Sequence, residues 1–384
     1  MNIENKNLNF IDLFLYLSIL LFLGRATFFP YLSVFISACI LGLLIFIFQI
    51  AHYKLSVYLA IFLACSLFIT ILLLVNNGLD SGLTFLPHTL AAIGMAWRIH
   101  THGINPRFVK ICFYLLIFNF FIFVLILNYN PEDIYMNSRN HISAMFINLI
   151  TLLYISYRIN NIHITIFPFI LILAASLISI GAAGIFVSLG IFFSYLLFRY
   201  TSILTKKLFL TFIVFIGFIF LLIYLWPYLT NYISNNYSFQ SDINIKYNRE
   251  FLSIITSNPR MEIYQEYINY LDIKYFLFGL PLDIEFKGFA NLHSSLLVLH
   301  SKAGIMIIPI ILLIFNSIYR LFKVDFLLFI FIISIILRSL TDTILFSGYH
   351  YEYVFMYLVF FAGKEKNDFK ANSIEVKYDK DEYK

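Results

Sequence analysis

Charged residues are scarce in this sequence. Lysine, arginine, aspartate and glutamate make up 12% of its 384 residues, whereas hydrophobic residues make up 61% and the mean hydropathy is +0.86. Soluble globular domains carry about 25% charged residues, so this composition excludes that class. Apolar runs of about 20 residues are typical of membrane-spanning helices. We therefore expect an all-α protein, a polytopic transmembrane helical bundle.

Cysteine is equally rare, and metal-binding patterns are absent. Cys39, Cys65 and Cys112 all fall within apolar segments, so we expect no disulfide framework. The sequence contains nine histidines but no HExxH motif, no paired CxxC motifs and no carboxylate cluster at ligand spacing. The net charge of +5 is spread over the loops and the C-terminal tail, which indicates membrane topology rather than nucleic-acid binding. We expect no metal, no cofactor and no nucleic-acid partner.

The apolar segments divide the chain into twelve predicted spans. They lie at about 10–24, 28–50, 55–75, 82–99, 108–128, 141–157, 163–180, 184–199, 208–229, 294–318, 324–341 and 346–362. The predicted organisation is therefore spans 1–9 within 1–229, a large loop at 230–293, spans 10–12 within 294–363 and a charged tail at 364–384.

Basic residues are distributed unevenly between the two sets of alternate loops. One set contains Lys54, Arg98, Arg107, Lys110, Arg158, Arg199, Lys206, Lys207, Arg320 and Lys323, and the opposite short loops contain Arg25 and Arg139. Short cytoplasmic loops are enriched in lysine and arginine. This rule places both termini in the cytoplasm and the loop at 230–293 on the outer face.

That outer loop is the longest polar interval between predicted spans, and loops of this length are usually functional or disordered. A helix start is predicted at Asn258-Pro259-Arg260, with a cap residue followed by proline. An apolar face follows at helical spacing, formed by Tyr264, Tyr267, Ile268 and Leu271. The loop ends in Asn-Leu-His-Ser-Ser at 291–295, which brings His293 to the mouth of the next span.

Three other places carry polar or small residues near the outer ends of predicted spans. Arg139, Asn140 and His141 open the sixth span. Arg338 and Asp342 are four residues apart, so they can pair on one helical face. The junction at 178–184 is rich in small residues and indicates close helix packing or room for a ligand.

A lipid-linked pyrophosphate matches these features as a ligand. Its acyl chain would lie between helices, and arginine binds phosphate through two charge-assisted hydrogen bonds. An imidazole can accept a proton from an attacking hydroxyl group. Tyr264, Tyr267 and Tyr270 offer flat faces for sugar rings.

The chain resembles the O-antigen polymerase and ligase superfamily of membrane glycosyltransferases. The likeness rests on the twelve spans, the outer loop between spans nine and ten, and Arg260 at a helix start in that loop. It continues in Phe278-Gly279-Leu280, in Asn-Leu-His-Ser-Ser-Leu at 291–296, and in Lys-Ala-Gly-Ile at 302–305. The topological likeness covers most of the chain, whereas the sequence likeness covers about 260–305.

The resemblance implies glycosyl transfer from an undecaprenyl-pyrophosphate donor at the periplasmic face of a bacterial inner membrane, without metal or nucleotide. By position, Arg260 matches the arginine that holds the pyrophosphate, and His293 matches the histidine that activates the acceptor hydroxyl. Asn291, Tyr264 and Tyr267 are the expected sugar contacts. The implied partners are lipid-linked repeat units, membrane lipid and a chain-length regulator protein.

One part of the family pattern is missing. Members commonly carry an arginine at the outer junction of spans seven and eight, where this chain has Ser-Ile-Gly-Ala-Ala-Gly at 179–184. We expect Arg139 to replace it, with Arg338 and Arg25 as the less favoured candidates.

Three functions fit this pattern to different degrees. A polymerase extends another lipid-linked repeat unit, whereas a ligase transfers the polysaccharide to the lipid A core. A lipid-linked oligosaccharide flippase or other transporter also has about twelve spans, but it would carry charges along a central cavity, and the predicted spans contain few. The sequence favours the polymerase.

Overall fold

The structure is a computed structural model that describes residues 10–27, 31–77, 79–131, 139–179, 182–200, 259–280, 292, 294–346 and 352–364. Within these residues every regular element is a helix. Six helices are long and apolar enough to cross a membrane, and four shorter apolar helices accompany them. The all-α class is thus confirmed for this part of the chain. The ninth predicted span, at 208–229, and the tail after Lys364 lie outside the described residues.

Most of the helices are close to the predicted spans. From the N-terminus to the gap after residue 200, the helices are α1 (Phe10–Thr27), α2 (Leu32–His52), α3 (Val57–Asn77), α4 (Leu79–His102), α5 (Pro106–Phe121) with a π-helical turn (Ile122–Ile126), α7 (Arg139–Ile159), α8 (Phe167–Ser179) and α9 (Ala182–Tyr200). After the gap in the description come α13 (Pro259–Tyr270), α14 (Ile273–Phe278), α15 (Ser295–Ala303), α16 (Ile307–Val324), α17 (Phe326–Thr341) and α18 (Glu352–Met356), which ends in a second π-helical turn (Tyr357–Phe361).

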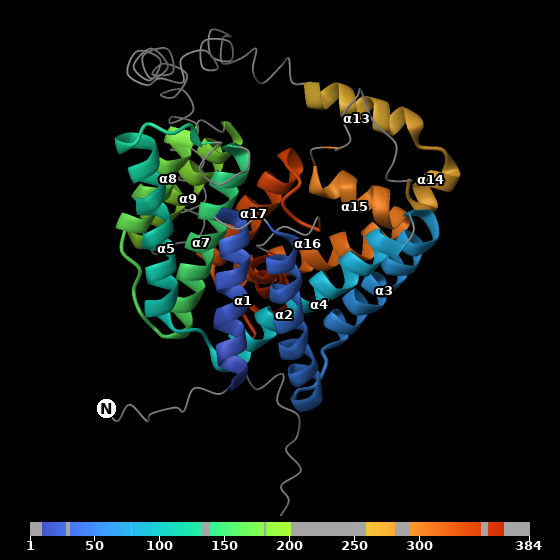
Figure 1. Cartoon of the computed structure of the whole chain (residues 1–384), viewed down its shortest axis with the longest axis horizontal. Helices are drawn as coiled ribbons and strands as arrows, with labels where there is room; N and C mark the ends of the chain where they lie inside the picture. The colour runs from blue at the N-terminus through green and yellow to red at the C-terminus, as the bar shows by residue number, and fades with distance from the viewer. Residues whose placement is uncertain are drawn as a thin grey trace, which may run out of the picture.

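The first four helices form one group, in which α2 packs on α1 and α4, and α4 also packs on α3 (Figure 1). The crossing of α2 and α4 is close because glycine faces the neighbouring backbone. A Cβ atom at Gly94 would lie 2.6 Å from the backbone nitrogen of Phe46, and one at Gly42 would lie 2.6 Å from the Cβ of Ala91. Small residues allow such close contact between helices in membranes.

A second group consists of α5, α7, α8 and α9 on the other side of the bundle (Figure 1). Gly184 at the start of α9 packs directly on Ser143 of α7. The small residues at this junction therefore serve close packing in its described part. The helices α16 and α17 join the two groups, because α16 contacts α3 and α17 contacts both α7 and α9.

The predicted tenth span, 294–318, is not one continuous helix. It is divided into α15 and α16 by a short 3₁₀ turn that begins at Gly304, whose φ is +52°. A side chain at this position would collide with the backbone carbonyl of Leu277 at the end of α14. The break therefore has two causes: a backbone conformation that glycine adopts readily, and close contact with α14.

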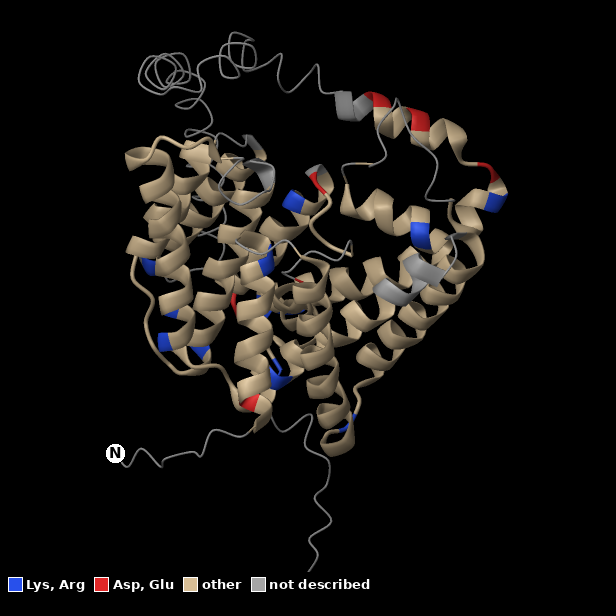
Figure 2. Ribbon diagram, in the orientation of Figure 1, with Lys and Arg blue, Asp and Glu red and all other residues tan. Residues whose placement is uncertain are grey.

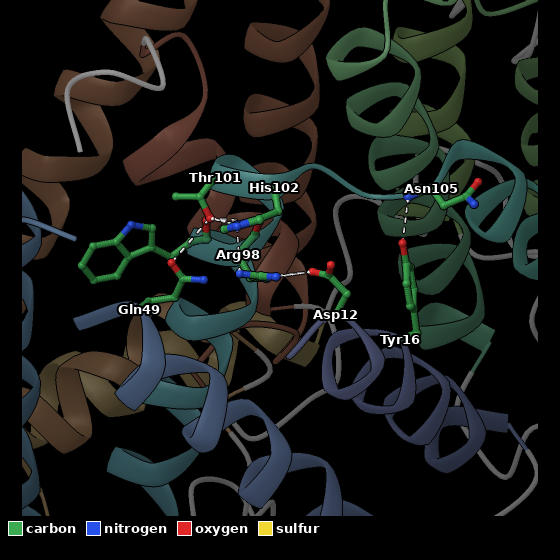
Figure 3. Close-up of polar contacts among 8 residues, drawn as sticks. Asp12, Tyr16, Gln49, Arg98, Thr101, His102 and Asn105 are labelled. Atoms are coloured by element: carbon green, nitrogen blue, oxygen red, sulfur yellow. Dashed lines mark hydrogen bonds and ion pairs between the residues drawn. The ribbon is translucent and has the colours of Figure 1, made fainter. Parts of the chain in front are cut away.

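Ion pairs join several helices at the end of the bundle that contains the close of α4 and the start of α5, which we call the basic end. Arg98 is fully buried and donates from Nε to Asp12 Oδ1 over 2.7 Å, which ties α4 to α1. Beside it, the hydroxyl of Tyr16 accepts a 3.2 Å hydrogen bond from the backbone of Asn105 (Figure 3). Arg158 Nε lies 2.6 Å from Asp325 Oδ2, which ties α7 to the α16–α17 link.

The basic end carries most of the lysine and arginine in the short loops (Figure 2), and large hydrophobic side chains are exposed on the outward faces of the helices. Ile36, Ile40 and Ile47 on one side of α2 are 47%, 52% and 60% exposed. Exposed aliphatic rows of this kind suit contact with lipid rather than water. The segments α13 and α14 lie at the opposite end, where Asn76 at the close of α3 donates a 3.1 Å hydrogen bond to the carbonyl of Phe278.

We expect Gly304→Ala to destabilise the protein. The substitution forces a strained backbone conformation and a collision with Leu277, at a cost of about 1–3 kcal/mol. The midpoint of thermal unfolding in detergent should fall. In the control, Gly190→Ala, the added methyl group has no neighbour within 4 Å in helix α9, so stability should hold or rise slightly. Equal effects of the two substitutions would contradict this account of the break.

Candidate functional site

The described residues that follow His293 in the chain lie where the start of α15 meets the close of α17, at the end of the bundle opposite the basic end. Ser295 joins the two helices. Its hydroxyl donates to the backbone carbonyl of Asp342 over 2.9 Å and accepts hydrogen bonds of 2.9 Å from the backbone nitrogens of Ile344 and Leu345. One buried hydroxyl therefore satisfies three backbone groups where α17 ends, and it fixes the position of the residues next to His293.

Arg338 and Asp342 form the pair that the sequence predicts. The Arg338 side chain is fully buried, and its Nη2 lies 3.3 Å from Asp342 Oδ2. Asp342 itself follows the last residue of α17, Thr341. Charges buried in a membrane bundle require partners of this kind. In this arrangement the Arg338 guanidinium is directed to a protein carboxylate.

The helix α13 covers this junction (Figure 1). The Tyr264 hydroxyl donates to the carbonyl of Leu340 over 3.1 Å, and the Tyr267 hydroxyl lies 2.6 Å from His300 Nδ1 on α15. Ile263 and Tyr267 are buried in a small apolar cluster together with Leu280 and Leu292. Hydrogen bonds to α15 and α17 and this apolar cluster thus hold α13 across the start of α15.

The predicted start of α13 is confirmed, because the helix begins at Pro259. Its predicted apolar face is only partly right. Tyr267 is buried and Tyr264 is half-buried, but Ile268 is 62% exposed and Ile263 takes the buried position instead. Tyr264, Tyr267 and Leu271 thus keep the predicted face, and Ile263 rather than Ile268 completes it.

The described residues place the predicted phosphate-binding arginines at three points. Position 260 is the second residue of α13, one turn before Tyr264. Position 139 is the first residue of α7, a helix that packs on α9 and α17. The side chains of both lie outside the described part. The Arg25 guanidinium carbon lies 4.1 Å from the centre of the Phe35 ring, near the close of α1.

The proposed catalytic residue, His293, and its neighbour Asn291 also lie outside the described residues. Their neighbours on either side are buried, since Leu292 is 5% exposed and Ser294 is 3% exposed. Tyr264 is half-buried and Tyr267 is 1% exposed, so in this conformation Tyr267 presents no open ring face to a sugar. Burial raises the pKa of the Tyr267 hydroxyl, which keeps it protonated and able to donate to His300.

Comparison with known proteins adds no relative. No protein-family model, curated protein or solved structure matches this chain. The likeness to the O-antigen polymerase and ligase superfamily therefore rests on the residues and topology of this sequence alone.

One buried ionisable pair was not predicted from the sequence. His88 of α4 and Glu352 of α18 are 4% and 1% exposed, and His88 Nδ1 lies 3.2 Å from Glu352 Oε2. The signal was an acidic residue inside the predicted twelfth span, since an ionisable residue in an apolar span calls for a partner. The buried Arg98–Asp12 pair was missed as well, because its members are 86 residues apart in the chain.

Tyr267→Phe should loosen α13. The change removes the hydrogen bond to His300 and leaves a buried imidazole nitrogen without that partner, which should lower stability by about 1 kcal/mol. Hydrogen exchange of the α13 amides should become faster. Tyr129→Phe is the matched control, because Tyr129 is 51% exposed and its substitution should leave the exchange unchanged. Unchanged exchange in Tyr267→Phe would show that this bond does not hold α13.

The Arg338–Asp342 pair should behave as a coupled unit. Asp342→Ala leaves a buried guanidinium without its carboxylate and should cost about 3–5 kcal/mol. The double variant Arg338→Met/Asp342→Ala should be more stable than the sum of the two single changes predicts. Unfolding midpoints of the four proteins measure this coupling. Additive losses would mean that the two side chains do not depend on each other.

Proposed function

We propose that this chain is a membrane glycosyltransferase, an O-antigen polymerase that joins lipid-linked oligosaccharide repeat units. One observation supports the proposal most directly. The contacts of Tyr264 with Leu340 and of Ser295 with Asp342 gather the helix that begins beside Arg260, the residues next to His293, and the Arg338–Asp342 pair at one end of the bundle. The first two of these segments carry the family resemblance.

The proposed reaction is a single displacement. His293 accepts the proton of a hydroxyl group on the acceptor sugar, and the oxygen attacks the anomeric carbon of the donor glycan. The bond from that carbon to the pyrophosphate oxygen breaks, and undecaprenyl pyrophosphate leaves with the bonding electrons. Arg260 and Arg139 stabilise the negative charge that grows on the pyrophosphate. Inversion at the anomeric carbon follows from a single displacement.

Arg338 has a supporting part in this proposal. Its guanidinium is buried against Asp342, and the backbone carbonyl of Asp342 accepts from Ser295, two residues after His293. The pair thus helps to hold Ser295, two residues after the proposed general base, in place. Residues that hold a catalytic group in place contribute to the rate because small displacements of reacting atoms cost large factors.

The proposed orientation follows from the distribution of charge. The basic end, with Arg98, Arg107 and Arg158, would face the cytoplasm, and α13 with the start of α15 would face the periplasm. Both termini would then be cytoplasmic, and the enzyme would act at the outer surface of the bacterial inner membrane, where lipid-linked repeat units are joined.

The two alternative functions are a ligase and a transporter. A ligase would use the same donor but transfer the polysaccharide to the lipid A core. A transporter is favoured by one specific observation, the buried His88–Glu352 pair, because ionisable pairs within a bundle line ion and substrate paths in transporters.

The first test is the lipopolysaccharide ladder of a strain that lacks the gene. The deletion should leave core carrying one repeat unit, and the wild-type gene should restore the ladder. His293→Ala and Arg260→Ala, expressed at the normal level, should not restore it, because a general base alone contributes about 10²–10⁴-fold to the rate. Matched controls are His163→Ala and Arg107→Ala, whose side chains are exposed at the basic end.

The outcomes of this test separate the three functions. Core without any repeat unit, with polymer accumulating on the lipid carrier, would indicate the ligase. An unchanged ladder after deletion would exclude glycosyl transfer. A restored ladder with His293→Ala would remove His293 from the reaction while leaving the class in place.

A further inference from the structure

The buried pair of His88 and Glu352 lies deep in the bundle. His88 is nine residues after the start of α4, which corresponds to a depth of about 14 Å along the helix. That is about half of a 30 Å hydrocarbon core. The imidazole is enclosed by aromatic rings, with its centre 6.0 Å from that of Phe22 and 5.3 Å from that of Phe35. Both ionisable groups are therefore shielded from bulk water.

The carboxylate of Glu352 has an unusual hydrogen-bond status. Its Oε2 lies 3.2 Å from His88 Nδ1, but among the described residues neither carboxylate oxygen accepts a well-directed hydrogen bond. Buried polar groups in proteins nearly always have partners, and each exception needs an explanation. A proton on the pair would explain how the carboxylate is buried without these hydrogen bonds. The proton either neutralises the carboxylate or converts the contact into an imidazolium–carboxylate ion pair.

The backbone is interrupted in the elements around this pair. Pro87 lies inside α4 next to His88, which removes a helical hydrogen bond at that level. The break at Gly304 between α15 and α16 is two residues from Lys302, and Glu352 is the first residue of α18. In membrane proteins, interrupted helices combined with buried charge mark the places where ions or substrates bind.

The other charged and titratable groups nearby are on α1, α2 and α15. Lys302 of α15 interacts electrostatically with Glu352, and its Nζ donates to the carbonyl of Phe346 over 3.3 Å. Cys39 of α2 is within electrostatic range of both Glu352 and Arg25. Lys302 is therefore the described cation that interacts with the carboxylate.

We propose that His88 and Glu352 form a buried proton-binding site that holds one proton between imidazole and carboxylate and exchanges it with water. The ligand is a proton because the rings of Phe22 and Phe35 lie against the imidazole and a proton needs no cavity. On release, the N–H or O–H bond breaks, its electron pair remains on the pair, and the proton passes to water. This inference does not depend on the proposed glycosyl transfer.

Difference infrared spectroscopy after a pH step tests this site in the full chain reconstituted in lipid nanodiscs. The protonated carboxyl group and the imidazolium ring give separate bands, so either carrier of the proton is detected. We expect a pH-dependent signal in the wild type that changes in both Glu352→Gln and His88→Gln and is lost in the double variant. Glutamine replaces both residues with little change in volume, and thermal unfolding checks that each variant is folded.

The control is the double variant Glu262→Gln/His163→Gln, which removes the same two residue types from exposed positions. The signal assigned to the buried pair must persist in it. The proposal is overturned if the double variant of the buried pair keeps the wild-type signal. It is also overturned if either single variant gives the wild-type spectrum. A proton that both groups bind must give a different infrared signal when one of them is replaced.

Discussion

The arrangement of this bundle depends on one constraint: a charge or backbone dipole removed from water must find its partner within the protein. Asp12 neutralises Arg98, Asp325 neutralises Arg158, and Asp342 neutralises Arg338, and each of these carboxylates lies at or near the end of a helix. Apolar contacts between the helices are not directional. The Arg98–Asp12 and Arg158–Asp325 pairs are directional and join different helices, so they specify which helix ends meet.

The two ends of the molecule use this constraint differently. At the basic end, arginine side chains reach across to carboxylates on other helices, which holds α1, α4, α7 and α17 together. At the opposite end, a serine hydroxyl, a buried ion pair and two tyrosine hydroxyls hold a short polar layer over α15. These contacts give the layer a firm frame of largely buried polar groups.

The sequence predicted the all-α class and the approximate bounds of most described helices, because a helix satisfies its own backbone groups in lipid. The count of twelve spans stays a prediction. It also predicted the start of α13 at Pro259 and the pairing of Arg338 with Asp342, since both follow from local rules of capping and spacing. It missed the break at Gly304, because an uninterrupted apolar run gives no sign of a backbone contact with Leu277. Likewise, no local pattern connects His88 with Glu352. Whether Arg260, Arg139 and His293 meet around a pyrophosphate stays a prediction.

The break at Gly304 also divides an apolar segment that is too long for the bilayer. The apolar stretch from Ser295 to Val324 contains 30 residues, which would form a straight helix of about 45 Å. That is about half again as long as a hydrocarbon core of about 30 Å, and a continuous rod would have to tilt steeply or distort the bilayer. By turning at Gly304, the chain leaves α16 to match the bilayer and turns α15 aside beneath α13 (Figure 1). The residues that exceed the bilayer thickness form α15, which lies under the polar layer. The hydrophobic mismatch is therefore accommodated within the protein and not by the bilayer.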